Sequence, residues 1–250
     1  MFPYQCAGTH QSPISIQTTA TERQELGMLQ LAGYSERAGR KMTLANIGHT
    51  VGLLLEGNYT LHGGGLPSVY VADQIHFHWG RSDSRGSEHV LDRRKYPAEM
   101  HIVHHDVSMS RDRTIHTPGG LAVLAVLMEI GEENKAFDEI VNRLPDVQFK
   151  DEATPMSQPI SVADLLPRNT DRFYRYAGSL TTPPCNEVVT WTVFQEPITI
   201  SRNQLSALRR LYETTRPSYL YNRRQRPRPL SDNFRPPQQL NGRRVYRNGF

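Results

Sequence analysis

The amino-acid sequence predicts a mainly β protein of the α+β class, with many strands and a few short peripheral helices. Runs rich in β-branched and aromatic residues, separated by Gly, Pro, Asn and Asp, dominate the chain. Helical periodicity appears in only three short stretches. Because strands and helices do not alternate, the pattern disfavours both a doubly wound sheet and a helix bundle.

The expected strands have alternating or continuous apolar patterns bounded by turn residues. They are Met28–Leu31, Thr43–Ala45, Val51–Leu55, Ser68–Val71, Gln74–Trp79, Glu99–His104, Leu121–Ile130, Phe173–Tyr176, Val188–Phe194 and Ile198–Ile200. The longest apolar run, residues 121–128, has the length of a buried strand and is too short for the roughly 18 residues of a membrane span.

Three segments carry helix signals. Residues 134–143 place apolar side chains at spacings of three and four and stop before Pro145. Residues 201–212 begin with a serine cap and repeat leucine on one face. Residues 162–166 are expected to form a short helical turn closed by Pro167.

The chain is expected to form one domain, residues 1–250. Its length suffices for a sizeable core, and no linker or repeat divides the first 215 residues. The first six residues have neither the basic nor the apolar part of a signal peptide.

Charge is concentrated at the C-terminal end. The formal net charge is +4, and residues 217–250 hold eight Arg against one Asp, which is +7 and leaves −3 for the remainder. The eight are Arg223, Arg224, Arg226, Arg228, Arg235, Arg243, Arg244 and Arg247. Such a segment is either a polyanion-binding surface or a solvated wrap on the domain. No nucleic-acid-binding module accompanies it, so nucleic acid is not an expected partner.

The two cysteines allow two interpretations. Cys6 and Cys185 are either unrelated buried thiols in a cytosolic protein or one disulfide formed in an oxidising compartment. Asn58 begins an Asn-Tyr-Thr glycosylation sequon.

A set of histidines carries the functional signal. His76 and His78 are two residues apart in a predicted strand, so their side chains point to the same face. His101 lies in a second predicted strand, which would add a third imidazole if the two strands pair. Three neutral imidazoles with one open position form the ligand set of a catalytic zinc site. Gln74 and Glu99 share faces with these histidines and are suited to orient them.

The histidines also allow other interpretations. Ten His in 250 residues give a His-x-His pair by chance about 0.4 times, so the pair alone fits surface or hydrogen-bonded histidines equally well. The His-Glu-x-x-His helix of a metalloprotease is absent. A cupin would need a Glu three or four residues after His78, but the next acids are Asp83 and Glu88.

Short motifs follow one another along nearly the whole chain. They are Gln11-Ser-Pro-Ile14, His76-Phe-His-Trp-Gly80, Ser87-Glu-His89, Glu99-Met-His-Ile-Val-His104, Gly120-Leu-Ala-Val-Leu124, Gly178-Ser-Leu-Thr-Thr-Pro-Pro184, Val189-Thr-Trp191, Glu196-Pro-Ile198 and Asn233-Phe-Arg-Pro236. In this order they resemble the α-class carbonic anhydrases, in particular their secreted, disulfide-bonded branch.

The resemblance implies a large, twisted, mostly antiparallel sheet with zinc at the base of a conical cavity. It implies that His76, His78 and His101 bind Zn²⁺ and that zinc hydroxide attacks CO2 to give bicarbonate; carbonic anhydrase is itself the reference case for this acidity of zinc-bound water. It assigns Thr181 to orient the hydroxide and Glu88 to accept the hydrogen bond of Thr181.

The family also implies roles around this centre. Asn233 would offer its backbone carbonyl to His78, beside the supporting residues Gln74 and Glu99. His49 would be the proton shuttle. The substrate wall would consist of Val103, Val123, Leu180, Thr181, Thr182, Val189 and Trp191.

The resemblance pairs Cys6 with Cys185 and places the protein outside the cell, where Asn58 could be glycosylated. Sulfonamide-type inhibitors are expected ligands. The chain departs from the family in a shortened N-terminal segment, in Ile47 and Phe234, and in His105, which replaces a common tryptophan. A catalytically silent binding or adhesion module is the alternative function, although such relatives typically lack a zinc histidine.

Overall fold

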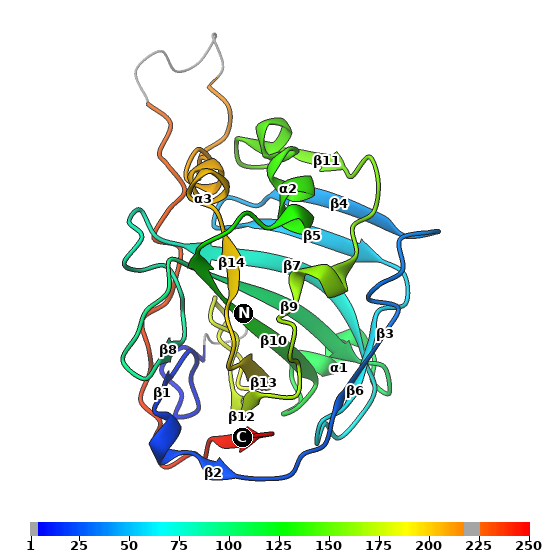
Figure 1. Ribbon diagram of the computed structural model, residues 1–250, viewed down its shortest axis with the longest axis vertical. Coiled ribbons are helices and arrows are strands. Elements are labelled where there is room, and N and C mark those ends of the chain that lie inside the picture. The colour runs from blue at the N-terminus through cyan, green and yellow to red at the C-terminus, as the bar shows by residue number, and fades with distance from the viewer. Residues whose placement is uncertain (1–4, 218–225) are drawn as a thin grey trace.

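The computed structural model describes residues 5–217 and 226–250, and within them a mixed sheet dominates (Figure 1). Its strands follow the order β11 (Ala153–Pro155), β4 (Lys41–Asn46), β5 (Val51–Glu56), β7 (Tyr70–Trp79), β9 (Ala98–Asp106), β10 (Leu121–Ile130), β13 (Val189–Phe194), β12 (Phe173–Gly178), β15 (Tyr246–Asn248) and β2 (Glu22–Arg23). β14 (Ile198–Ile200) pairs with β10, and β6 (Thr60–Gly63) pairs with β7 and with β3 (Leu29–Ala32). β1 (Ser15–Ile16) and β8 (Val90–Leu91) form a small separate parallel pair.

The sheet is mostly antiparallel, as expected. Among the described residues, its parallel pairs are β10 with β13, β10 with β14, and β15 with β2. The mainly β fold class predicted from the sequence is therefore confirmed.

The central strands are buried on both faces. Along β10, Leu124 and Val126 face one hydrophobic cluster, whereas Val123 and Ala125 face the other. The first cluster is covered by the helical segments, and the second is closed by β1, β8 and Val245 near the C-terminus. Burial on both faces explains why residues 121–128 read as a continuous apolar run rather than an alternating one.

The helices are short and capped by their own sequence. α2 (Lys135–Val141) begins after Asn134, whose side chain accepts hydrogen bonds from two backbone amides of the first turn. α3 (Arg202–Leu208) begins with a capping box formed by Ser201 and Gln204. α1 (Arg111–Thr114) is a single turn, and the 3₁₀ segments are η1 (Thr18–Ala20), η2 (Leu144–Val147) and η3 (Val162–Leu165). In the described part of the chain, no helix has the length and apolar character needed to cross a bilayer.

The structure corrects several predicted boundaries. Ser68–Val71 and Gln74–Trp79 belong to one strand, β7, whose pairing with β9 shifts between Ala72 and Gln74. Such an irregularity interrupts the alternation on which the prediction relied. The predicted helices 134–143 and 201–212 end earlier, at Val141 and Leu208. Residues 142–143 and 209–210 form turns instead of continuing the helices. The sequence did not predict the short strands β1, β2, β6, β8, β11 and β15.

The C-terminal segment wraps against the N-terminal one. Arg235 donates to the carbonyl oxygens of Cys6 and Ser12, and Arg243 to that of Gln11. Arg247 donates to the carbonyls of residues 18, 21 and 250. These three arginines therefore bind main chain rather than facing solvent as free charges.

Candidate active site

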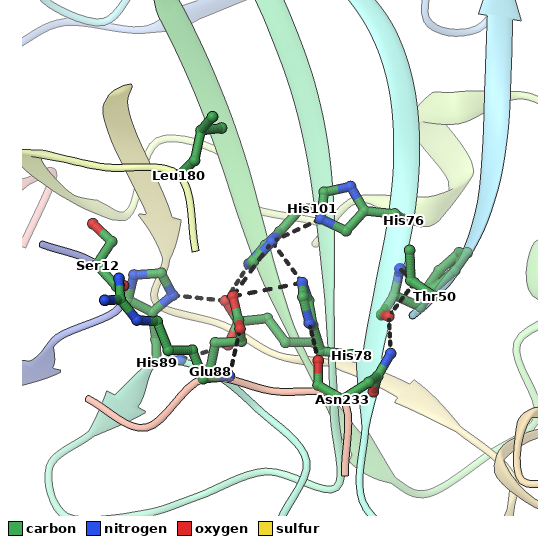
Figure 2. A network of polar contacts seen from close by, with 12 residues as sticks. Ser12, Thr50, His76, His78, Glu88, His89, His101, Leu180 and Asn233 are labelled. Carbon is green, nitrogen blue, oxygen red and sulfur yellow. Dashed lines mark hydrogen bonds and ion pairs between the residues drawn. The ribbon is translucent and has the colours of Figure 1, made fainter. Parts of the chain in front are cut away.

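Three imidazole rings converge on one face of the central sheet (Figure 2). His76 and His78 lie two residues apart on β7, and His101 lies on β9 directly opposite His76 in the antiparallel register. The strand geometry predicted from the sequence is thus the geometry that brings the three side chains together.

The distances between the ring nitrogens match a tetrahedral metal site. His78 Nε2 lies 3.2 Å from His101 Nδ1, which lies 3.3 Å from His76 Nε2. Zinc–nitrogen bonds of 2.0–2.1 Å at tetrahedral angles place ligand nitrogens about 3.3 Å apart. Burial, followed by the neighbouring histidines, lowers the pKa of His76 well below its ordinary value, and burial also lowers the pKa of His101. These two rings are neutral at pH 7, as metal ligation requires.

The outer nitrogens of two rings are held by acceptors. His78 Nδ1 donates to the carbonyl oxygen of Asn233 at 2.8 Å, and His101 Nε2 donates to Glu99 Oε1 at 2.6 Å. A carbonyl or a carboxylate can only accept, so the lone pairs of His78 Nε2 and His101 Nδ1 face the centre. His76 Nδ1 is buried without a partner, and Gln74 makes no hydrogen bond to it in the structure.

A fourth histidine, His89, is buried beside this site and extends the support, although the sequence predicted no role for it. The backbone and ring nitrogens of His89 donate to Glu99 at 2.8 and 2.6 Å, and His89 Nε2 lies 2.7 Å from Tyr176 Oη, which contacts Ser12. Burial alone would raise the pKa of Glu99, but His89 and His101 outweigh it and hold that pKa well below its usual range. The sequence could have indicated these two residues, because His89 and Ser12 both lie within motifs that carry the family resemblance.

Glu88 leaves one oxygen facing the histidines. Its Oε1 accepts a hydrogen bond from the Arg235 backbone amide at 2.7 Å. Its Oε2 is buried without a hydrogen bond, 3.5 Å from His78 Nε2 and 3.9 Å from His101 Nδ1. A buried, unpaired carboxylate oxygen is costly unless a cation or a donor compensates it. The residues present therefore fit a divalent cation between the three imidazoles.

Comparison with known proteins agrees with this geometry. Residues 1–249 match the family model of the eukaryotic-type carbonic anhydrases. The chain belongs to this family. It is 39% identical to carbonic anhydrase 12 of Homo sapiens over 96% of the chain and 67% of that protein, and 39% identical to carbonic anhydrase 4 of Oryctolagus cuniculus over 97% and 77%. It is 36% identical to a putative carbonic anhydrase 3 of Caenorhabditis elegans over 95% and 89%. These matches identify the enzyme as a carbonic anhydrase, a family that uses zinc.

The apolar residues expected at the carbonic anhydrase substrate wall lie beside the histidines. Val123 pairs with Val103 on one side and with Trp191 on the other, and Val189 pairs with residue 121 in the same ladder. These side chains belong to one buried cluster, and Leu180 packs against it. The Trp191 ring centre lies 4.9 Å from that of His101, so these apolar residues lie directly beside the three histidines.

The loop that carries Thr181 and Thr182 is partly buried beside this wall. Thr182 accepts a hydrogen bond from the Cys185 amide through its carbonyl oxygen. The hydrogen bond expected between Thr181 and Glu88 is absent from the structure, where Glu88 Oε2 has no such partner.

His49 is exposed in the turn between β4 and β5, as a proton shuttle requires. Partial burial, and then the neighbouring charges of His78 and Lys150, lower its pKa below 6.5. At pH 7 its imidazole is therefore neutral and able to accept a proton.

The predicted disulfide is present. Cys6 and Cys185 are bonded, with their Cα atoms 4.9 Å apart. The bond joins the N-terminal segment to the loop that follows Thr181 and Thr182, and Gln11 reinforces it by donating to the Cys185 carbonyl at 3.1 Å.

Proposed function

We propose that this carbonic anhydrase hydrates CO2 reversibly to bicarbonate and a proton, with Zn²⁺ held by His76, His78 and His101. The observation that carries the proposal is the tetrahedral spacing of the three ligand nitrogens beside the unpaired Glu88 oxygen. When bound, zinc supplies Lewis acidity that lowers the pKa of a water molecule to about 7, an effect for which carbonic anhydrase is the reference case.

The surrounding residues would position the reactants. The apolar wall of Val103, Val123, Leu180, Val189 and Trp191 suits CO2, which is small and apolar. We assign Thr181 to orient the oxygen nucleophile and to donate a hydrogen bond from its hydroxyl to Glu88 Oε2, which is free to accept. Thr182 would line the same rim. Gln74 would support His76, whose Nδ1 lacks a partner.

A stopped-flow assay of CO2 hydration, run with and without a zinc chelator, tests this function. Activity that a chelator abolishes and added zinc restores would support it. A zinc-loaded protein without activity would favour the alternative, a silent binding or adhesion module. The retained histidines, Glu88 and Thr181 favour the enzyme.

His49 is proposed to carry protons from the site to solvent. In weak buffer we expect His49→Ala to lower the hydration rate about 10-fold, below the usual range for acid–base catalysis because the neighbouring Ile47 makes the path less polar. Added imidazole should restore most of the rate, since attack on CO2 does not use His49. The control is His62→Ala, which removes an exposed histidine on β6. Equal rates for wild type and His49→Ala at every buffer concentration would refute the role.

We infer that residues 1–250 form one catalytic domain that works outside the cytosol, in keeping with its disulfide. Asn58 lies exposed in the turn between β5 and β6, accessible for glycosylation. Sulfonamide-type inhibitors would bind at the proposed zinc site.

The Arg-rich segment is proposed to bind polyanions such as sulfated glycans. Arg226 and Arg228 are exposed, and Arg228 pairs with Glu213 at 2.9 Å; Arg223 and Arg224 lie outside the described residues. We expect serine at these four positions to lower the salt concentration that elutes the protein from heparin, because fewer charges remain to attract the polyanion. CO2 hydration should stay nearly unchanged.

A matched control removes four positive charges elsewhere on the surface. This control variant carries serine in place of Lys41, Lys95, Arg168 and Arg210, which are all exposed. If both variants elute at the salt concentration of the wild type, residues 217–250 do not bind polyanions and only cover the domain as a solvated segment.

A further inference from the structure

The strand that carries two zinc ligands loses its neighbour between them. β5 pairs with β7 from Leu54 opposite Gln74 as far as Gly52 opposite His76, and the pairing ends there. Phe77, which lies between His76 and His78, therefore has no partner residue in β5. Buried backbone groups at such a point need other partners.

Two side chains replace the missing ladder bonds. Thr50 Oγ1 donates to the Phe77 carbonyl at 2.6 Å and accepts from the Phe77 amide at 3.2 Å. Asn233 Nδ2 donates to the same carbonyl at 3.0 Å (Figure 2).

Asn233 also reaches the proposed shuttle. Its Nδ2 donates to the His49 carbonyl at 3.0 Å, and its Oδ1 accepts from the Trp79 amide at 2.8 Å. One amide side chain thus bonds the main chain of His49 and the main chain on both sides of His78. The remaining contact, from His78 Nδ1 to the Asn233 carbonyl, uses backbone and does not depend on this side chain.

The turn that holds His49 has hydrogen bonds of its own and one to Asn233. It contains Gly48 at a φ of +88°, and its other side is fixed by Asn46, which accepts from the Gly48 amide at 2.9 Å. On the side facing β7, Asn233 supplies the hydrogen bond to His49 itself. The turn is also closed by a hydrogen bond from the Ile47 amide to the Thr50 carbonyl at 3.0 Å, so Asn233 does not form the turn but ties it to β7.

We propose that the Asn233 side chain is a positioning residue for proton transfer, because it fixes the His49 main chain against the part of β7 that carries His76 and His78. The proposal rests on the proposed function of His49 as the shuttle. It separates the two contributions of Asn233: the carbonyl supports a metal ligand, and the amide side chain holds the shuttle.

Asn233→Ala tests this, because it removes the side chain and keeps the carbonyl. We expect a loss of about 5-fold in CO2 hydration in weak buffer, a much smaller loss in imidazole buffer, and one zinc per chain. In a His49→Ala background, the same change should add no further buffer-dependent loss. Asn233→Ser, whose hydroxyl can still donate to one carbonyl, should recover part of the rate and serves if the alanine variant does not fold.

Thr50→Val is the matched comparison, since it removes hydrogen bonds to Phe77 but leaves the bond to His49 intact. An equal buffer-dependent loss in this variant would overturn the proposal, because the effect would then come from β7 alone. Loss of zinc from Asn233→Ala, or an equal loss at all buffer concentrations, would also overturn it.

A second readout does not depend on activity. The carbonyl ¹³C resonance of His49 is sensitive to the hydrogen bond that this carbonyl accepts from Asn233. It should shift in Asn233→Ala but not in the control variant His62→Ala. An unshifted resonance would refute the anchor. If the wild type hydrates no CO2, the proposed function fails, and a shift in Asn233→Ala alone would still confirm the anchor without assigning it to proton transfer.

Discussion

His101→Ala is expected to yield a protein without bound zinc and without measurable CO2 hydration. The substitution removes one of the three ligand nitrogens, so that only His76 and His78 remain and the Glu88 oxygen stays unpaired. Two imidazoles do not complete the three-ligand set of a catalytic zinc site. Elemental analysis after dialysis, beside the stopped-flow assay, measures both losses, and tight zinc retention by the variant would contradict the assignment.

A graded variant separates loss of a ligand from loss of its support. Glu99→Gln keeps all three ligands but replaces the carboxylate that accepts from both His101 and His89. We expect its zinc affinity to fall about 10- to 100-fold rather than vanish, the usual cost of disturbing a residue behind a metal ligand. His62→Ala again serves as the control, with zinc content equal to wild type. Thermal unfolding of each apoprotein shows whether a variant has simply lost its fold.

The fold could be predicted where the chain itself determines local structure. β10 and β14 were predicted with their observed bounds, because an apolar run flanked by Gly or Pro leaves few alternatives. β6 and β11 were missed because they are short and contain Gly or Pro, and their pairing depends on neighbours distant in sequence. The parallel pairing of β10 with β13 is likewise set by tertiary packing, which strand patterns do not encode.

The histidine set was predictable for a physical reason. The two-residue repeat of a strand places His76 and His78 on one face in any β structure. The His101 register, the Glu88 orientation and the His89 support depend on residues brought together from separate segments. The sequence indicated His101 from its place in a second predicted strand and Glu88 only through the resemblance, and it gave His89 no role. The hydrogen bonds of the Asn233 side chain had no sequence signal.

The disulfide joins residues 179 positions apart, and its removal is expected to have the largest effect on stability. In the chain-entropy model, a crosslink of this span lowers the free energy of the folded state relative to the unfolded one by roughly 5 kcal/mol. That is comparable to the whole stability of many domains, typically about 5–15 kcal/mol. Cys6 also accepts from Arg235 through its carbonyl, and Cys185 follows the Thr181–Thr182 loop. Opening the bond therefore also frees the loop proposed to orient the nucleophile.

The double variant Cys6→Ser/Cys185→Ser should unfold at a much lower denaturant concentration than the wild type, with a loss of roughly 5 kcal/mol in the free energy of unfolding. Using both substitutions avoids leaving one free thiol. A reducing agent provides the matched control: it should bring the wild type to the midpoint of the double variant and leave the double variant unchanged. If reduction has no effect on the wild type, or if native protein presents two alkylatable thiols, the bond does not form in solution. Because the bond closes a loop of 179 positions, even a partly compensated crosslink should leave a shift that equilibrium unfolding resolves.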